Sequence, residues 1–180
     1  MKERLKRPLL PIGPLPEPRG PRAAVTAVLV GDPLSVLLIK RRERPGDPWS
    51  GHVALPGGFV APSDGDPLEA ALRELREEVG VEVSVNDIIG MLSLAKPLNR
   101  PEVEVVPFVA YLEDPPKLSL GGEVEAARWV PLKRLEPRSV EVTWRDGAAV
   151  VEGFMVEGWV VWGLTARLLK ELTSRLSGLI

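Results

Sequence analysis

The segment 67–80, PLEAALRELREEVG, predicts the best-delimited helix in this chain of 180 residues. Its apolar side chains recur at helical spacing: Leu68, Ala71, Leu72, Leu75 and Val79. Pro67 suits the first turn of a helix, and Asp66 is the natural cap before it. Gly80 supplies the stop. The limits of this helix are therefore predictable, and the elements around it decide the fold class.

Strand patterns surround the helix. Two β-branched and aliphatic runs, 23–30 and 35–41, flank a Gly-Asp-Pro turn and predict paired strands. Further strands are expected at 53–55, 88–94, 103–112 and 126–130. The C-terminal run GWVVWGLTARLLKELTSRL indicates a strand end that passes into an amphipathic helix. Strands mixed with two well-separated helices predict an α/β or α+β layered domain.

The N-terminal segment 1–22 differs from the rest, because prolines stand at positions 8, 11, 14, 16 and 18. They interrupt any apolar stretch that a signal peptide would need. We expect an extended, polyproline-type arm that packs along the domain or stays mobile. A hydrophobic content of 44% in 180 residues suffices for one core. The predicted organisation is therefore an arm at 1–22 and one domain at 23–180.

Composition excludes several classes of function. The net charge of −2 gives no excess of basic residues for a long DNA or RNA backbone. The chain has no cysteine, which excludes disulfides, thiolate zinc sites and cysteine nucleophiles, and this fits a reducing cytosol. No apolar run is long enough to span a bilayer. We expect a cytoplasmic protein without DNA or membrane partners, and leave a homodimer open.

Glutamine is absent, asparagine occurs twice and proline 19 times. This balance is typical of proteins adapted to heat.

Three carboxylates share one edge of the predicted helix. At about 3.6 residues per turn, Glu74, Glu77 and Glu78 fall within an arc of roughly 100°, beside the apolar stripe. Glu74 and Glu78 repel at i,i+4, and the last turn of a helix prefers cations. An ordinary solvated charge face, with Arg73 and Arg76 as partners, is the plain alternative. Clustered carboxylates without histidine or cysteine are also the hard oxygen ligands that magnesium or manganese takes.

The pair Gly57-Gly58 precedes this helix, where we expect a strand to leave into a loop. A loop without side chains lets a backbone carbonyl approach a metal or a phosphate closely. A simple turn is an equally good interpretation of the pair taken alone.

These residues resemble a known family. The glycine pair, an acidic loop and RELREEVGV are similar to the Nudix box, G-x5-E-x7-R-E-U-x-E-E-x-G-U, where U is aliphatic. The second half matches throughout: Arg73, Glu74, Leu75, Glu77, Glu78, Gly80 and Val81. The first half departs, because Gly65 stands at the glutamate position and Gly58 comes one residue early. Asp64 or Asp66 is the candidate replacement for the missing loop acid.

The flanks resemble the Nudix branch that includes coenzyme A pyrophosphatases, from about residue 23 onward. The segments that carry this resemblance are LLIKRRERPGDPWSGHVALPGG, VVPFVAYL, EVEAARWVPL and VVWGLTARLL. Leu55 stands where that branch usually has phenylalanine. The resemblance implies a Nudix-type α/β/α sandwich with a mixed central sheet.

The resemblance also implies a reaction, the hydrolysis of a diphosphate linked to a second moiety with Mg²⁺ or Mn²⁺. The small-molecule substrate expected is a nucleoside diphosphate derivative such as coenzyme A or another ADP compound. Glu74, Glu77, Glu78 and the Gly58 carbonyl would hold the metal, which lowers the pKa of bound water. Arg73, by resemblance, orients the glutamates.

Candidates for the general base are Glu77, Glu78 and Glu123, the last in the segment GGEVEAARW. For Glu123, plain solvation is equally plausible. Arg41 and Arg44 are expected to grip phosphate, because guanidinium groups match its oxygens. The alternative interpretation of Arg41 and Arg44 is that both are solvated charges at the end of a strand. Gly57 and Gly58 are expected beside the substrate.

Aromatic and histidine side chains give weaker signals. His52 either contacts substrate or satisfies backbone groups near a turn, and we favour the structural role. A serine triad is disfavoured, because PWSGH lacks the first glycine of a nucleophile elbow. Trp49 is a candidate for stacking on a base, and three other tryptophans are expected in the core or an interface: Trp129, Trp159 and Trp162.

Two functions of different classes remain. The first is a metal-dependent diphosphate hydrolase, and the second is a non-catalytic nucleotide-sensing module that regulates a partner. The intact REXXEE core favours the enzyme. A Nudix-type isomerase and an RNA-cap hydrolase are further alternatives, of which the acidic balance disfavours the second.

Overall fold

The computed structural model describes residues 1–46, 50–144 and 147–180. Its helices are α1 (Lys2–Lys6), α2 (Pro67–Val79) and α3 (Gly163–Arg175), with 3₁₀ turns η1 (Val85–Asp87) and η2 (Leu132–Arg134). Its strands are β1 (Arg22–Val30), β2 (Ser35–Arg41), β3 (Val53–Ala54), β4 (Gly57–Phe59), β5 (Ile88–Met91), β6 (Glu104–Leu112), β7 (Val124–Pro131), β8 (Arg138–Trp144), β9 (Gly147–Val156) and β10 (Trp159–Val161).

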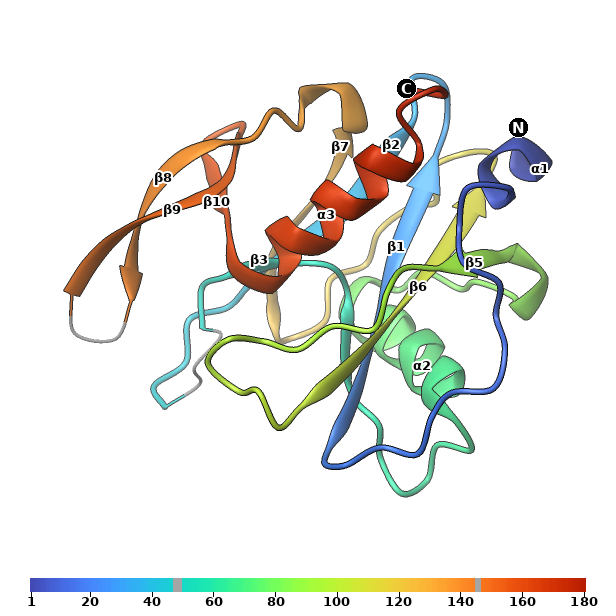
Figure 1. Cartoon of the computed structure of the whole chain (residues 1–180), viewed down its shortest axis with the longest axis horizontal. Coiled ribbons are helices and arrows are strands. Elements are labelled where there is room, and N and C mark those ends of the chain that lie inside the picture. The colour runs from blue at the N-terminus through green and yellow to red at the C-terminus, as the bar shows by residue number, and fades with distance from the viewer. Residues whose placement is uncertain (47–49, 145–146) are drawn as a thin grey trace.

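The central sheet is mixed, as predicted. Its main path runs β3-β2-β1-β6-β5, with β7 added beside β2 and β4 beside β1. β1 and β6 pair in parallel along their whole length, whereas the other pairs are antiparallel. The two long parallel strands form the middle of the molecule (Figure 1).

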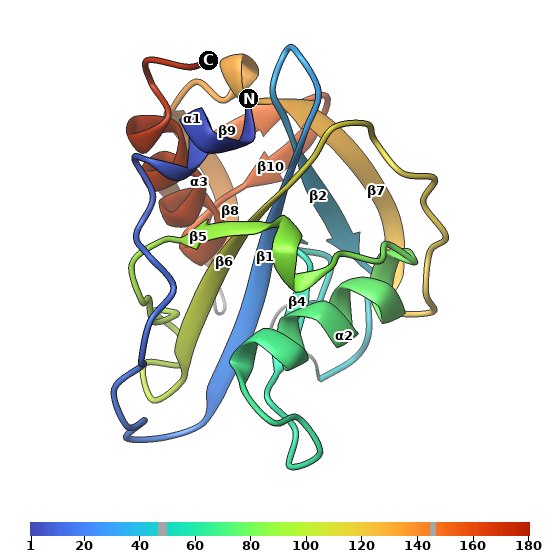
Figure 2. The ribbon, with the colours of Figure 1, turned by 90° about the vertical axis from the view of Figure 1, so that its right-hand side faces the viewer.

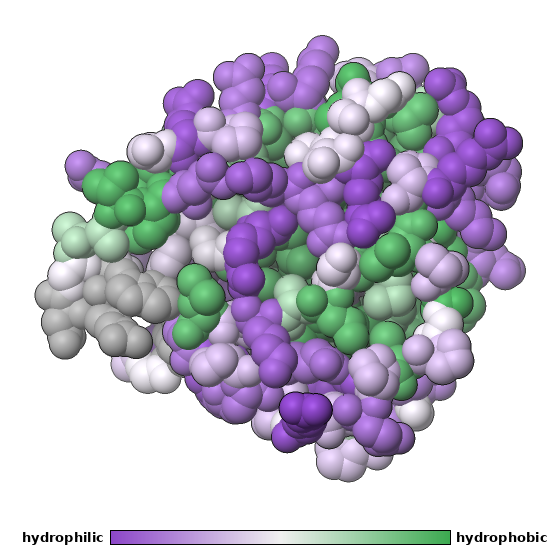
Figure 3. Space-filling view, viewed as in Figure 1, coloured by the Kyte–Doolittle hydropathy of each residue, from purple (hydrophilic) through white to green (hydrophobic). Residues whose placement is uncertain are grey.

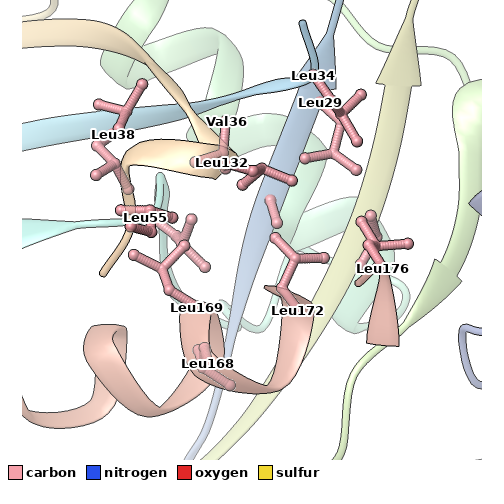
Figure 4. Packing of buried hydrophobic residues seen from close by; sticks show 14 of the residues in the cluster. Leu29, Leu34, Val36, Leu38, Leu55, Leu132, Leu168, Leu169, Leu172 and Leu176 are labelled. Carbon is pink, nitrogen blue, oxygen red and sulfur yellow. The ribbon is translucent and has the colours of Figure 1, made fainter. Parts of the chain in front are cut away.

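Alternation along β1 divides the core between the two long helices. Ala24 and Val28 face the cluster that contains the apolar side of α2, whereas Ala27 and Leu29 face the cluster that contains α3. Because successive side chains of a strand point to opposite faces of the sheet, β1 contributes to the hydrophobic core on both faces. Figure 2 shows α2 and α3 on opposite sides of the sheet, and Figure 4 shows Leu169 and Leu172 of α3 on the side of Leu55 and Leu132. The predicted α/β/α sandwich is confirmed.

Helix α2 begins and ends as its sequence predicts. The Asp66 side chain accepts a hydrogen bond from the Glu69 N–H at 2.9 Å. Gly80 closes the helix with a φ of 68°, and its N–H donates to the Arg76 carbonyl. This left-handed conformation is one that glycine adopts at little cost.

The predicted strands recur with small shifts, and one prediction is wrong. β5 ends at Met91, earlier than the predicted 88–94, and β7 extends beyond 126–130 at both ends. Gly57 and Gly58 were expected in a loop, but they form β4 and pair with Val25 and Ala24 of β1. A Cβ at Gly57 would lie 2.2 Å from the Ala24 carbonyl oxygen. The missing side chain of Gly57 therefore lets this strand lie close against β1.

The N-terminal segment is also different from expectation, because it starts with the short helix α1. Leu5 of α1 is fully buried, and Leu9, which follows the helix, is nearly so; both belong to the core cluster that contains α3. Leu10 then forms an isolated antiparallel bridge with Met91. Burial of Leu5 holds this short helix against the core, and the first proline, Pro8, comes only after it. The arm packs along the domain, one of the two expected outcomes.

A second sheet has the order β10-β9-β8; β10 is the strand end expected before α3, whereas β8 and β9 were not predicted. It extends to one side of the sandwich in Figure 1. β9 carries two exposed hydrophobic side chains, Val150 and Met155, and Figure 3 shows hydrophobic side chains over this sheet. The signal was present and was missed: in β8, Val140 and Val142 alternate with the polar residues Ser139, Glu141 and Thr143, which is the pattern of a half-buried strand.

The expected positions of three tryptophans are partly correct. Trp159 is buried under the Arg128 guanidinium at 4.3 Å from its ring, and Trp129 packs against the α2 cluster. Trp162 instead precedes α3 at a cavity. None of the helices in the described ranges has the length and apolar character needed to cross a membrane.

Candidate active site

The three glutamates of α2 lie along one edge of the helix but differ in exposure. The Glu78 side chain is 4% exposed, that of Glu74 is 19% exposed and that of Glu77 is 55% exposed. Glu78 turns toward β4, where its Oε2 accepts a hydrogen bond from the Gly57 N–H at 2.9 Å. The helix edge therefore passes from the protein interior at Glu78 to solvent at Glu77.

Arg73 connects the two more exposed glutamates. Its Nη1 donates to Glu74 Oε1 at 2.8 Å and to Glu77 Oε2 at 3.1 Å. A guanidinium has five N–H donors in a fixed plane, so it can hold two carboxylates at once and still bond elsewhere. The structure thus places Arg73 where it can position the glutamates.

The remaining donors of Arg73 bind the loop before α2. Nε and Nη2 donate to the two carboxylate oxygens of Asp64 at 2.9 and 3.0 Å. These bonds, followed by one from the Ala61 N–H, lower the pKa of the Asp64 carboxyl below its ordinary value. Asp66 instead caps the helix. Of the two candidate loop acids, Asp64 is therefore the one connected to the site.

Glu78 is the most perturbed acid of the site. Burial raises the pKa of its carboxyl to about 7, and the negative charges of Glu74 and Glu123 act in the same direction. The Gly57 N–H and the Arg41 guanidinium, 3.5 Å away, oppose this change. A buried carboxyl with such a pKa gains strongly from a nearby cation.

Gly58 leaves room for Glu74. A Cβ at this position would lie 2.5 Å from Glu74 Oε1, closer than real Cβ atoms approach. The carboxylate thus rests directly against the backbone of β4. Carboxylates and a backbone carbonyl form a set of hard oxygen donors, which fits a divalent cation such as Mg²⁺ or Mn²⁺.

The carboxylates do not converge as the sequence predicted. Among the residues that the structure describes, no group of three or more acidic or histidine side chains has the spacing of a metal site. Each glutamate accepts a hydrogen bond from a protein group instead. Glu74 and Glu77 accept from Arg73, and Glu78 accepts from the Gly57 N–H. The three glutamates lie along one edge of α2, as expected. They could coordinate a metal ion together only after their side chains change rotamer.

Glu123 reaches the site through the loop that covers the end of α2. The N–H groups of Ser119 and Gly121 donate to the carbonyls of Val79 and Glu78 at 2.8 and 2.9 Å. These bonds satisfy carbonyls that a helix end leaves open. The loop thereby brings Glu123 beside the acidic edge.

The two arginines predicted to grip phosphate both lie near Glu123. Arg44 Nη1 is 2.7 Å from Glu123 Oε1, and Arg41 Nη2 is 4.0 Å from Oε2. Arg41 also lies 3.5 Å from Glu78. The structure therefore places both cations beside the acids, where they offset negative charge.

A cavity of about 930 Å³ opens at this edge. Six of the predicted site residues line it: Arg41, Gly57, Gly58, Arg73, Glu74 and Glu123. Glu77 and Glu78 flank this group without lining the cavity, and Arg44 reaches it through Glu123. Its volume falls in the range of small-molecule sites.

His52 and Trp162 also line this cavity and pack edge to face at 5.0 Å between ring centroids. The prediction of a structural role for His52 missed its place at the cavity. Trp49 lies outside the described residues. Residues of β9 and α3 that line the cavity were not predicted as site residues, because they have no motif and only the fold brings them near α2.

Comparison with known proteins agrees with this geometry. The sequence model for the NUDIX domain matches residues 20–148, which include α2, β4 and Glu123. The chain belongs to the Nudix hydrolase family.

Two Nudix hydrolases show the extent of the similarity. The protein named Uncharacterized Nudix hydrolase NudL, from Escherichia coli strain K12, is 31% identical over 156 residues, with 84% of this chain and 80% of the relative covered. Nudix hydrolase 15, mitochondrial, from Arabidopsis thaliana, is 33% identical over 168 residues, with 85% of this chain and 58% of the relative covered.

Solved Nudix structures share the fold. A MutT/nudix family protein from Enterococcus faecalis aligns with a TM-score of 0.62 at 21% identity, covering 92% of this chain and 66% of the other. The NUDIX domain of Shewanella oneidensis NrtR, complexed with ADP ribose, aligns with a TM-score of 0.53 at 21% identity. The alignment covers 68% of this chain and 79% of the other. The matched NUDIX range ends within β9, so α3 lies beyond it.

Proposed function

We propose that this Nudix hydrolase cleaves the diphosphate bond of a nucleoside diphosphate-linked metabolite, with coenzyme A or another ADP derivative as the substrate class. The main support for this proposal is one cavity beside the buried carboxyl of Glu78. It is lined by Gly58, Arg73, Glu74 and Glu123. A cluster of acids at a cavity repels a polyphosphate unless a cation lies between them, so metal dependence is part of the proposal.

Glu74, Glu77, Glu78 and the Gly58 carbonyl would hold Mg²⁺ or Mn²⁺. When bound, the metal neutralises phosphate oxygens and lowers the pKa of a water molecule. Arg73 keeps two of the glutamates in place through its bonds to them and to Asp64. Arg41, at the cavity wall, supplies a positive charge for the phosphate groups.

The general base is assigned within the same proposal. Of the three candidate bases, Glu123 lines the cavity, whereas Glu77 and Glu78 do not. Its carboxylate oxygens lie 2.7 Å from Arg44 Nη1 and 4.0 Å from Arg41 Nη2, which holds it at the cavity wall where it can accept a proton from water. Phosphoryl transfer then depends mainly on positioning and on stabilising charge.

The test is hydrolysis of a panel of diphosphates with Mg²⁺ or Mn²⁺: coenzyme A, ADP-ribose, dinucleoside polyphosphates and nucleoside triphosphates. We expect metal-dependent release of a monophosphate product by the unmodified chain. Glu77→Gln should nearly abolish it with the fold intact, because Glu77 is exposed and carries no packing role. Glu82→Gln, at an exposed position just past α2, is the matched control and should retain full turnover.

Equal turnover by the unmodified chain and Glu77→Gln would remove Glu77 from the mechanism. Absence of turnover on every diphosphate, together with retained nucleotide binding, would favour the nucleotide-sensing module instead. A loss of turnover in Glu82→Gln as large as that in Glu77→Gln would show that the effect is not specific to the acidic edge.

A further inference from the structure

Glu123 stands where the regular pairing of β2 with β7 breaks off. The register shifts between Lys40 and Arg41, because Glu125 of β7 is an extra residue in the ladder. Such a β-bulge interrupts the hydrogen bonds of a sheet and is common beside active sites. β2 ends at Arg41 and β7 begins at Val124, so Glu123 lies just outside the sheet. Its position therefore depends on contacts other than the ladder.

The carboxylate of Glu123 contacts two arginines at the protein surface. Arg44 lies 2.7 Å and Arg41 4.0 Å from its oxygens, and the side chains of Glu123 and Arg44 are 55% and 49% exposed. An exposed ion pair contributes little free energy and holds its partners weakly. A displacement of about 1 Å at a reacting group nevertheless costs on the order of 100-fold in rate. The place of Glu123 thus depends mainly on how its main chain is held.

Arg42 holds this main chain. Its N–H donates to the Glu123 carbonyl at 2.8 Å, its Nε to the Gly122 carbonyl at 3.0 Å and its Nη2 to the Val124 carbonyl at 3.4 Å. One residue therefore binds three consecutive carbonyls, with that of Glu123 in the middle. A guanidinium suits this task, because its donors lie in a fixed plane.

The other side of the same loop is fixed to α2. The Gly121 N–H donates to the Glu78 carbonyl at 2.9 Å, and a Cβ at Gly121 would lie 2.2 Å from the Glu77 carbonyl oxygen. Figure 2 shows the connection between β6 and β7 passing the end of α2. The segment 121–124 is thus held between Arg42 and the helix that carries the acids.

Arg42 itself lies apart from the cavity. Arg41, the residue before it, lines the cavity, whereas Arg42 does not. The Arg42 side chain is directed at the loop carbonyls instead. Its influence on a reaction in the cavity must therefore act through Glu123.

We infer that Arg42 is a positioning residue for the hydrolysis: it holds the main chain of residues 122–124 and so keeps the Glu123 carboxylate at the cavity wall. This inference rests on the proposed function, in which Glu123 accepts a proton from water. It gives Arg42 a role in the reaction without a contact to substrate or metal.

The first test compares Arg42→Met with the unmodified chain on the preferred diphosphate with Mg²⁺. Methionine has no hydrogen-bond donor, so both side-chain bonds are lost and the N–H bond to Glu123 remains. We expect kcat to fall by about tenfold and KM to stay unchanged, because Arg42 does not line the cavity. Equal kcat values would overturn the inference.

Arg42→Lys separates geometry from charge. Lysine keeps the positive charge but not the planar set of donors, so it should recover only part of the lost kcat. Full recovery would show that the charge is sufficient and would overturn the inference. Arg42 is exposed, so both substitutions should leave the core intact, and thermal unfolding checks this.

Lys40→Met is the matched control. Lys40 lies on the same strand, and its Nζ is 2.9 Å from Glu125 Oε1, two residues beyond Glu123. The variant removes the same charge and one contact to β7, but none of the bonds to the loop carbonyls, so kcat should be retained. A loss as large as that in Arg42→Met would show a general effect of the β2–β7 pair and overturn the inference.

A double variant distinguishes positioning through Glu123 from a merely structural effect. Arg42→Met should lower kcat no further in the Glu123→Gln background, because the carboxylate that Arg42 positions is already absent. Losses that multiply would overturn the inference, since Arg42 would then act independently of Glu123. Full kcat in Glu123→Gln would also overturn it, and would leave the diphosphate hydrolase standing with another base.

Amide hydrogen exchange measures the hold on the loop without turnover. Amides of residues 119–124 should exchange about fivefold faster in Arg42→Met, and at the original rate in Lys40→Met. Unchanged exchange in Arg42→Met would overturn the inference whether or not the chain hydrolyses a diphosphate. Absence of hydrolysis by the unmodified chain, with faster exchange in Arg42→Met, would overturn the proposed function and support the hold of Arg42 on the loop.

Discussion

Helices α2 and α3 have the same length, thirteen residues, but contribute differently to one cavity. α2 has a side-chain cap at Asp66, a left-handed glycine after its last residue and an edge of charged groups. α3 begins after Trp162 without a side-chain cap, and its first turns line the apolar part of the cavity. The difference teaches that the acidic edge belongs to a helix whose limits are fixed by local sequence, whereas the apolar lining of the cavity belongs to a helix fixed by packing.

The largest expected effect concerns the contact between α2 and β4. Gly58→Ala places a Cβ 2.5 Å from Glu74 Oε1, so the carboxylate must move. A displacement of about 1 Å costs on the order of 100-fold in rate, and we expect kcat for the preferred diphosphate to fall by that amount. The control is Gly13→Ala, because a Cβ there meets nothing within 4 Å. Unchanged kcat in Gly58→Ala would show that Glu74 does not need its place against β4.

The next effect tests the local stability of α2. Asp66→Ala removes the hydrogen bond to the Glu69 N–H and should lower the free energy of unfolding by about 1 kcal/mol. For a chain of this size this corresponds to a decrease in Tm of roughly 2–4 °C. Glu82→Ala, at an exposed position outside the helix, serves as control. Equal Tm values for the two variants would mean that tertiary packing alone determines where α2 begins.

The smallest effect tests how α3 is held. Glu171 of α3 accepts bonds from the Ser93 N–H at 3.0 Å, the Ser93 hydroxyl at 2.9 Å and Arg175 Nε at 2.8 Å. Burial alone raises the pKa of this carboxyl, but these three bonds outweigh it and the pKa is lowered from its ordinary value of 4.5. The stabilisation is therefore fully present above pH 4.5 and is lost as the pH falls through the lower pKa of the folded state.

Glu171→Gln should accordingly reduce stability at pH 7 by less than ~1 kcal/mol, and the difference should shrink toward pH 3. Urea unfolding of both proteins at several pH values measures it. Glu136→Gln, at an exposed position, provides the reference for an ordinary surface glutamate. A Glu171→Gln difference that is constant with pH would show that the carboxylate charge does not hold α3.

Sequence patterns predicted α2, the paired strands and the joint edge of three glutamates, because each depends on contacts between residues close in sequence. They did not predict α1 or β4, since α1 is held by burial of Leu5, and β4 by the close approach of Gly57 to β1. The choice of Asp64 over Asp66 also needed the structure. Both acids stand near Arg73 in sequence, and only the loop geometry decides which one the guanidinium reaches.

The sequence by itself determined the family, the helix that carries the acids and the oxygen-rich chemistry of its edge, because capping, spacing and charge act within a few residues. The tertiary structure alone decided that Glu78 is buried, that Glu123 faces Arg41 and Arg44, and that β9 and α3 continue the cavity with apolar walls. Burial and long-range contacts arise only when distant segments pack together, and their free energy is not written in any one segment.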